Sequence, residues 1–102
     1  MALDFTVLGK NGSPEKTVSP GVDLHHALMK IAASLDAAHV QRFVDYYEDV
    51  EITFPELPSL ADEVLELRSR IDYGEMRRFL EDLEGLISHA MAEQKPLHAI
   101  AD

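Results

Sequence analysis

Residues 76–91 read MRRFLEDLEGLISHAM and contain the most regular hydrophobic pattern of the chain. Their apolar residues recur every three or four positions, which places them on one face of an α-helix. These positions are Met76, Phe79, Leu80, Leu83, Leu86, Ile87, Ala90 and Met91. Gly85 interrupts the pattern and costs roughly 1 kcal/mol relative to alanine, which a close approach to another element would explain. Pro96 ends the helix, because proline cannot continue it.

Three further helical patterns lie upstream. Residues 60–71 carry leucine, valine and isoleucine at helical spacing, and residues 59–62 resemble a capping box. Residues 24–35 form another apolar stripe, for which Asp23 is a suitable N-cap. A pattern over residues 40–47 predicts one more helix, packed against its predecessor through a short connection.

Alternating apolar and polar residues predict two strands, at residues 3–8 (LDFTVL) and 50–54 (VEITF). The turn signal Asn11-Gly12 follows the first strand, and Thr17-Val18 can form a short return strand. We expect residues 50–54 to pair with residues 3–8, because an isolated strand leaves its backbone groups unpaired. Residues 97–100 (LHAI) form an apolar tail that can add an edge strand or fill a groove.

These patterns predict an α+β fold with about four helices and a small antiparallel sheet made from the N-terminal strand and residues 50–54. The length of 102 residues predicts a single domain over residues 1–102. Apolar residues make up 46% of the chain, which is enough for a hydrophobic core that forms without disulfide bonds or structural metal ions. The absence of cysteine excludes disulfides, thiolate metal sites and cysteine nucleophiles.

The charge is strongly acidic. Nineteen acidic residues against nine basic ones give a net charge of −10. A field of this sign repels phosphate backbones and anionic lipid headgroups, so binding to nucleic acid or to a membrane surface is not expected. The N-terminus lacks the pattern of a signal peptide, and no apolar run is long enough to span a bilayer. We therefore expect a cytoplasmic protein.

Acidic residues are concentrated in one segment. No lysine or arginine occurs between Arg42 and Arg68, whereas eight acidic residues and the aromatic residues Tyr46, Tyr47 and Phe54 fall there. Carboxylates around exposed aromatic rings favour a binding surface for a basic protein, because the rings anchor the contact and the charges steer encounter. The predicted partner-binding residues are Asp45, Tyr46, Glu48, Asp49, Glu51 and Glu56. The alternative is that Tyr47 and Phe54 belong to the core and the acidic residues form a solvated face.

Metal-binding and catalytic patterns are weak. His25 and His26 are adjacent, so on a helix they point about 100° apart and cannot both ligate from one face. No His-x-x-x-His or His-Glu-x-x-His spacing occurs. On a helix Asp45, Glu48 and Asp49 would share a face where a divalent cation could bind, but the calcium-loop pattern is missing. No nucleophile elbow, P-loop or dinucleotide fingerprint is present, so we expect no enzyme, no cofactor and no metal.

Three stretches together resemble a group of small bacterial proteins: LDFTVL at residues 3–8, DYYED at residues 45–49 and PLHAIAD at residues 96–102. The group consists of immunity-type proteins of polymorphic-toxin and contact-dependent inhibition systems. The resemblance spans nearly the whole chain and contains no diagnostic motif. It implies a cytoplasmic, non-catalytic protein that binds a cognate toxin, and it assigns no functional residues.

The first functional hypothesis is therefore a toxin-neutralising immunity protein that binds a basic partner through the acidic and aromatic surface. A second hypothesis is a structural or regulatory subunit that forms a homodimer through its apolar tail and its last helix. Both are non-catalytic, and they differ in the surface that makes the contact. A third hypothesis, from another class, is a small metal-dependent enzyme such as a hydrolase.

Overall fold

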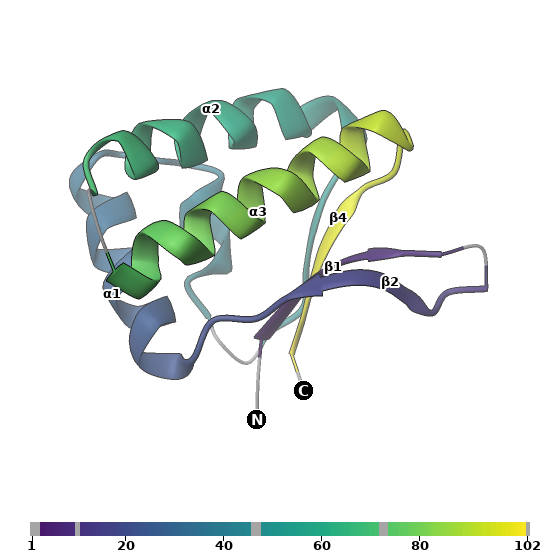
Figure 1. Cartoon of the computed structure of the whole chain (residues 1–102), viewed down its shortest axis with the longest axis horizontal. Coiled ribbons are helices and arrows are strands. Elements are labelled where there is room, and N and C mark those ends of the chain that lie inside the picture. The colour runs from purple at the N-terminus through teal and green to yellow at the C-terminus, as the bar shows by residue number, and fades with distance from the viewer. Residues whose placement is uncertain (1–2, 10, 46–47, 72–73, 102) are drawn as a thin grey trace.

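The structure, a computed structural model, describes residues 3–9, 11–45, 48–71 and 74–101. Four strands, three α-helices and two short 3₁₀ turns are found in these ranges (Figure 1). In chain order they are β1 (Leu3–Leu8), β2 (Pro14–Val18), α1 (Val22–Ser34), η1 (Val40–Phe43), β3 (Val50–Ile52), η2 (Phe54–Glu56), α2 (Leu57–Ser69), α3 (Gly74–Ala92) and β4 (Leu97–Ala101). The predicted α+β class is confirmed, with three α-helices instead of about four.

The strands form one antiparallel sheet in the order β2-β1-β4-β3. The predicted pairing of β1 with β3 is wrong, because β4 lies between them and pairs with both. Ala99 of β4 stands opposite Phe5 of β1 on one side and opposite Val50 of β3 on the other. The expectation that the C-terminal tail forms an edge strand or fills a groove is also wrong: β4 is an inner strand, and its Leu97 and Ala99 are fully buried.

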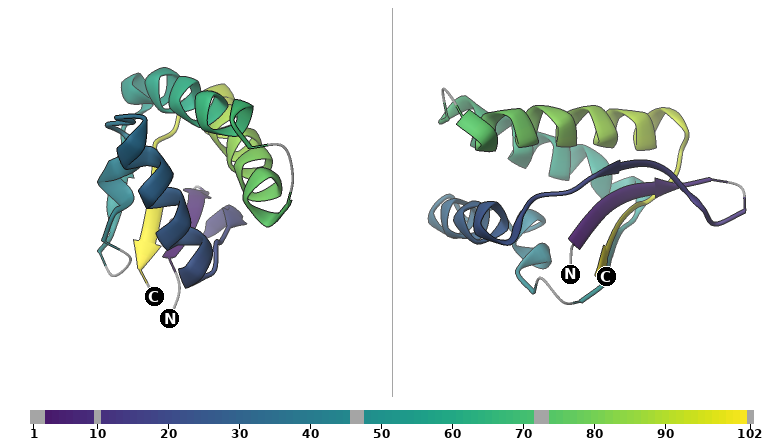
Figure 2. Two further views of the ribbon diagram at one scale, coloured as in Figure 1. Left: turned by 90° about the vertical axis from the view of Figure 1, so that its left-hand side faces the viewer. Right: turned by 60° about the horizontal axis from the view of Figure 1, so that its bottom comes forward.

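The helices cover the sheet from one side. Figures 1 and 2 show α2 and α3 side by side above the strands, with α1 at one end of the sheet. Leu3, Phe5 and Val7 alternate along β1 and are fully buried, since they face this layer. The ring of Phe5 meets those of Phe43 and Phe79 edge to face, with centroids 4.9 and 5.8 Å apart. Phe5 therefore joins the sheet to η1 and α3 at the centre of the core.

The helix predicted over residues 40–47 is not found in its described part, residues 40–45. Val40–Phe43 makes a single 3₁₀ turn, Val44 is exposed, and Tyr47 lies outside the described residues. Val40 and Phe43 are both buried, and one turn is enough to bury two side chains that are three residues apart. A single turn therefore accounts for the apolar spacing of Val40 and Phe43, and no longer helix is required to bury them.

The predicted N-caps of two helices are wrong. Gly21 caps α1, and Asp23 lies in the first helical turn, where a carboxylate still favours the helix dipole. The capping box expected at residues 59–62 does not form, because α2 already begins at Leu57. A reciprocal capping box occurs earlier, between Thr53 and Glu56 at the start of η2.

The α3 helix follows its predicted pattern, and Phe79, Leu80, Leu83, Leu86, Ile87 and Ala90 are all buried. Gly85 does not mark a close approach, since a Cβ atom added there would meet nothing within 4 Å. Within the described ranges, no helix has both the length and the apolar character to cross a membrane.

We expect Phe5→Ala to lower the free energy of unfolding by about 3–5 kcal/mol, because it removes the ring that joins three elements of the core. Phe54→Ala is the matched control, since the Phe54 side chain is 40% exposed, and its loss should be about 1 kcal/mol. Urea unfolding followed by circular dichroism measures both values. Equal losses in the two variants would contradict this account of the core.

Candidate functional site

The predicted acidic surface lies along one edge of the sheet. Asp45, Glu48 and Asp49 belong to the connection between η1 and β3, Glu51 belongs to β3, and Glu56 ends η2. Tyr46, the remaining predicted partner-binding residue, lies outside the described residues. The described residues of this connection, 44–45 and 48–49, are not helical, so Asp45, Glu48 and Asp49 do not share the helical face that was expected.

Asp49 anchors the end of β4 through a side-chain hydrogen bond. One of its carboxylate oxygens, Oδ1, accepts a hydrogen bond of 2.7 Å from the backbone N–H of Ala101. The bond joins the entrance of β3 to the last residue of β4, across 52 positions of sequence. Asp49 therefore has a structural role, although nothing in its sequence context separates it from the adjacent Glu48.

Glu56 also has a structural role. Its Oε1 atom accepts hydrogen bonds from the backbone N–H and the hydroxyl of Thr53, at 3.1 and 2.8 Å. Its Oε2 atom lies 2.8 Å from Nη1 of Arg42. The hydroxyl and backbone hydrogen bonds of Thr53, helped by the charges of Arg42 and His39, lower the pKa of Glu56 below its ordinary value of 4.5.

Arg42 also protects the edge of the sheet. Its Nη2 atom donates a 2.9 Å hydrogen bond to the backbone carbonyl of Glu51 in β3. Because β3 is an edge strand, this guanidinium occupies an acceptor that another strand could otherwise use. One backbone acceptor of this edge strand is therefore already used within the chain.

Exposed apolar side chains accompany the remaining acidic residues. Val44 and Phe54 are 65% and 40% exposed, and they lie in sequence on either side of Glu48 and Glu51. The alternative that placed Phe54 in the core is wrong. Glu48 and Glu51 are exposed, and no lysine or arginine among the described residues pairs with either of them. We call Val44, Glu48, Glu51 and Phe54 the acidic edge surface.

The histidines are dispersed. His25 is buried, and its Nε2 atom lies 2.6 Å from the carbonyl oxygen of Phe43, whereas His26 is exposed. The prediction that these neighbours face different ways is therefore confirmed. His39 hydrogen-bonds through Nδ1 to Glu63, whose other oxygen accepts the backbone N–H groups of His39 and Val40 at 2.9 and 3.1 Å. That carboxylate holds the start of η1.

Beside the His39–Glu63 pair lies a hollow of about 290 Å³, between the connection that follows α1 and the middle of α2. Two larger hollows, of about 400 and 450 Å³, lie along β2 and α3, and Thr17, Val18 and Asp82 line both of them. The two larger hollows are lined by a mixture of acidic, basic and apolar side chains.

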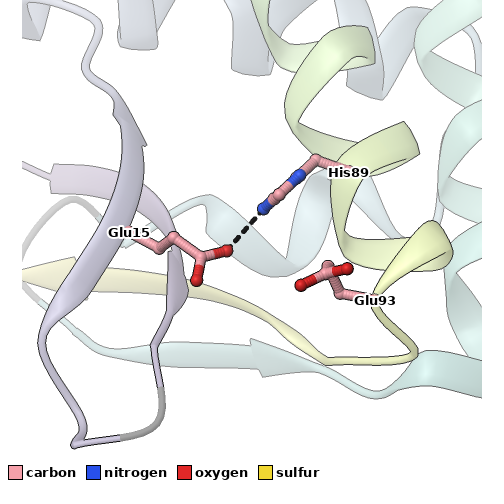
Figure 3. A group of neighbouring side chains, drawn as sticks. All are labelled: Glu15, His89 and Glu93. Carbon is pink, nitrogen blue, oxygen red and sulfur yellow. Dashed lines mark hydrogen bonds and ion pairs between the residues drawn. The ribbon is translucent and has the colours of Figure 1, made fainter.

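One cluster of potential metal ligands was missed in the sequence. Glu15 of β2, His89 of α3 and Glu93, in the turn that follows α3, place one ligand atom each within 4.8 Å of one another (Figure 3). His89 Nε2 donates a 2.6 Å hydrogen bond to Glu15 Oε1, and Lys95 Nζ lies 3.6 Å from Glu15 Oε2. The hydrogen bond from His89, together with the charge of Lys95, lowers the pKa of Glu15 below 4.5.

Part of this cluster was visible in the sequence. His89 and Glu93 are four residues apart, a spacing that brings two side chains to one side of a helical turn. Glu15 lies 74 residues before His89, so only the packing of the β1–β2 hairpin against α3 brings it to the cluster.

Comparisons with protein families, with curated proteins and with solved structures found no match for this chain.

We expect Glu56→Gln to reduce stability at neutral pH and to matter less in acid. The folded protein holds the pKa of Glu56 below its ordinary value, so this carboxylate stabilises the fold above about pH 4.5. The contribution is lost as the pH falls through the lowered pKa. Urea unfolding from neutral pH down to about pH 3 should show the two proteins converging in acid.

Glu48→Gln is the control for that experiment, since Glu48 is exposed and has no such capping role. It should follow the parent protein over the whole range. A constant difference between Glu56→Gln and the parent at all pH values would contradict the assignment of the effect to this carboxylate.

Proposed function

We propose that the protein is a non-catalytic binding protein whose acidic edge surface engages a basic protein partner. The observation that supports this most is the exposure of Val44 and Phe54, which lie close in sequence to the exposed Glu48 and Glu51. Four large apolar residues are exposed among the described residues, and two of them, Val44 and Phe54, lie within residues 44–54. Single exposed apolar residues are common, but two within one acidic segment favour an interface.

The surface combines two kinds of contact. An aromatic ring such as Phe54 can enter a pocket of the partner and supply much of the binding energy. The carboxylates of Glu48 and Glu51 are exposed and have no arginine or lysine partner among the described residues; Glu51 lies 3.9 Å from His98 Nε2, and both can still face a cationic surface. The net charge of −10 extends this attraction beyond the contact, since it raises the rate of encounter with a basic protein.

The most specific form of the proposal is a cytoplasmic immunity protein that neutralises a basic toxin. Such a protein binds one target in a one-to-one complex and needs no catalytic group. An acidic surface with exposed apolar anchors suits a nuclease toxin, because an enzyme that acts on nucleic acid presents cationic residues around its active site.

The alternative of a self-associating subunit has less support. It was expected to use the apolar tail and the last helix, but β4 has neighbouring strands on both sides. The apolar face of α3 is buried against the sheet and α2. Both surfaces are therefore already used within one copy of the chain.

We expect Glu48→Lys combined with Glu51→Lys to slow association with the partner by about tenfold or more at low salt and to leave folding intact. Asp49 is excluded from the variant, because its hydrogen bond to Ala101 holds β4. The partner is first captured by a pull-down from lysate of the protein's own source at low and high salt, and association is then measured by biolayer interferometry.

The matched control is Glu81→Lys combined with Asp82→Lys, on an exposed part of α3. Each double variant replaces two negative charges with two positive ones, so both change the net charge from −10 by four, to −6. The control should retain most of the association rate. Equally slow association in both double variants would show that only the net charge matters, and it would contradict a binding site at the acidic edge surface.

Phe54→Ala should mainly speed dissociation, because an anchor contributes after encounter. We expect the Kd to rise by about tenfold or more, with little change in the association rate. Val22→Ala is a suitable control, since Val22 is an exposed apolar residue at the start of α1, outside the acidic edge surface. An unchanged dissociation rate for Phe54→Ala would remove Phe54 from the interface.

A further inference from the structure

We infer that Glu15, His89 and Glu93 form a binding site for a divalent transition-metal ion of the Zn²⁺ class. Figure 3 shows the three side chains converging on one space, with Glu15 from β2, His89 from the last turn of α3 and Glu93 from the turn that follows it. Their ligand atoms already lie within 4.8 Å of one another. The site lies at the opposite edge of the sheet from the acidic edge surface, so the inference does not depend on the proposed function.

The ligand set selects the ion. An imidazole nitrogen together with two carboxylates suits Zn²⁺ and similar transition metals, whereas Mg²⁺ and Ca²⁺ prefer sets made of oxygen alone. Three protein ligands leave a fourth position for water in a tetrahedral site. We therefore expect one Zn²⁺ ion per chain and much weaker binding of Mg²⁺.

The charges of the cluster favour the binding of a cation. Two carboxylates, those of Glu15 and Glu93, approach one another beside His89. Lys95 pairs with Glu15, but no lysine or arginine among the described residues pairs with Glu93. Like charges at this separation repel each other, and a bound divalent ion would offset the repulsion.

The required rearrangement is small. Ligands at about 2.1 Å from a tetrahedral Zn²⁺ ion are about 3.4 Å apart. Glu15 Oε1 and His89 Nε2 are 2.6 Å apart, so they must separate slightly while Glu93 moves closer. Glu15 and Glu93 are exposed and His89 is half-buried, so side-chain rotation of the two glutamates is sufficient.

Binding would connect two remote parts of the chain. Glu15 lies in the β1–β2 hairpin, and His89 lies 74 residues later near the end of α3. A metal ion bound by these residues would cross-link the hairpin to α3. Such a cross-link stabilises the folded state, because the ligands that it joins are far apart in the sequence. Zn²⁺ should therefore raise the melting temperature and slow hydrogen exchange in β2.

The test is isothermal titration of chelator-treated protein with zinc chloride, and separately with magnesium chloride. His89→Gln and Glu93→Gln should each weaken Zn²⁺ binding by about tenfold or more. Lys95→Gln should tighten it, since Lys95 competes with the ion for Glu15. His26→Gln is the control, because His26 is exposed on α1 and is not one of the three ligands, and its affinity should match the parent.

Hydrogen exchange provides a second measurement that does not depend on the heat signal. Added Zn²⁺ should protect the amides of β2 in the parent protein and in His26→Gln, but not in His89→Gln. The inference is overturned if Zn²⁺ binds no more tightly than Mg²⁺, or if His89→Gln binds Zn²⁺ as the parent does.

Discussion

The fold depends on the backbone pairing of β4 with two strands that are remote from it in the sequence. β1 comes from the start of the chain and β3 from its middle, and β4 hydrogen-bonds to both. Without β4, neither strand has a neighbour on that side, and the buried Leu97 and Ala99 are lost from the core. The hydrogen bond from Ala101 to Asp49 extends this pairing to the connection before β3. The acidic edge surface is thus attached to the sheet by the last strand of the chain.

The same topology separates the two proposed sites. β2 and β3 form the two edges of the sheet, so Glu15 and Glu51 lie on strands that never meet. At the β3 edge, Arg42 covers a backbone acceptor, and the side chains of the acidic edge surface remain exposed. At the β2 edge, α3 lies close enough to bring His89 and Glu93 to the hairpin. A protein partner and a metal ion could therefore bind without competing for the same residues.

Local sequence patterns predicted most of the helices and strands, but they could not predict which strands pair with each other. Period-two and period-3.6 spacing correctly placed β1, α1, α2 and α3, because each buries one face and needs no knowledge of its neighbours. The order of the strands was wrong, since residues 97–101 compete with residues 50–52 for the same edge of β1, and nothing local ranks the two. The helix predicted over residues 40–47 was wrong for a similar reason: Val40 and Phe43 reach the core from a single turn.

The candidate site could be predicted only in part. The acidic composition of residues 45–56 can be read from the sequence, but the exposure of Phe54 and the position of Glu15 beside His89 depend on the folded chain.

The acidic residues of the segment divide into two groups that sequence alone cannot separate. Asp49 and Glu56 accept hydrogen bonds from backbone N–H groups, which stabilises the fold and compensates for part of their desolvation. Glu48 and Glu51 have outward positions, where a carboxylate adds little to stability and increases the repulsion within a chain of charge −10. Adjacent residues such as Glu48 and Asp49 therefore differ in what their charge does, although their chemistry is nearly the same. Glu51 lies 3.9 Å from His98 Nε2, and Glu48 has no ion pair among the described residues, so neither carboxylate holds the backbone as Asp49 and Glu56 do.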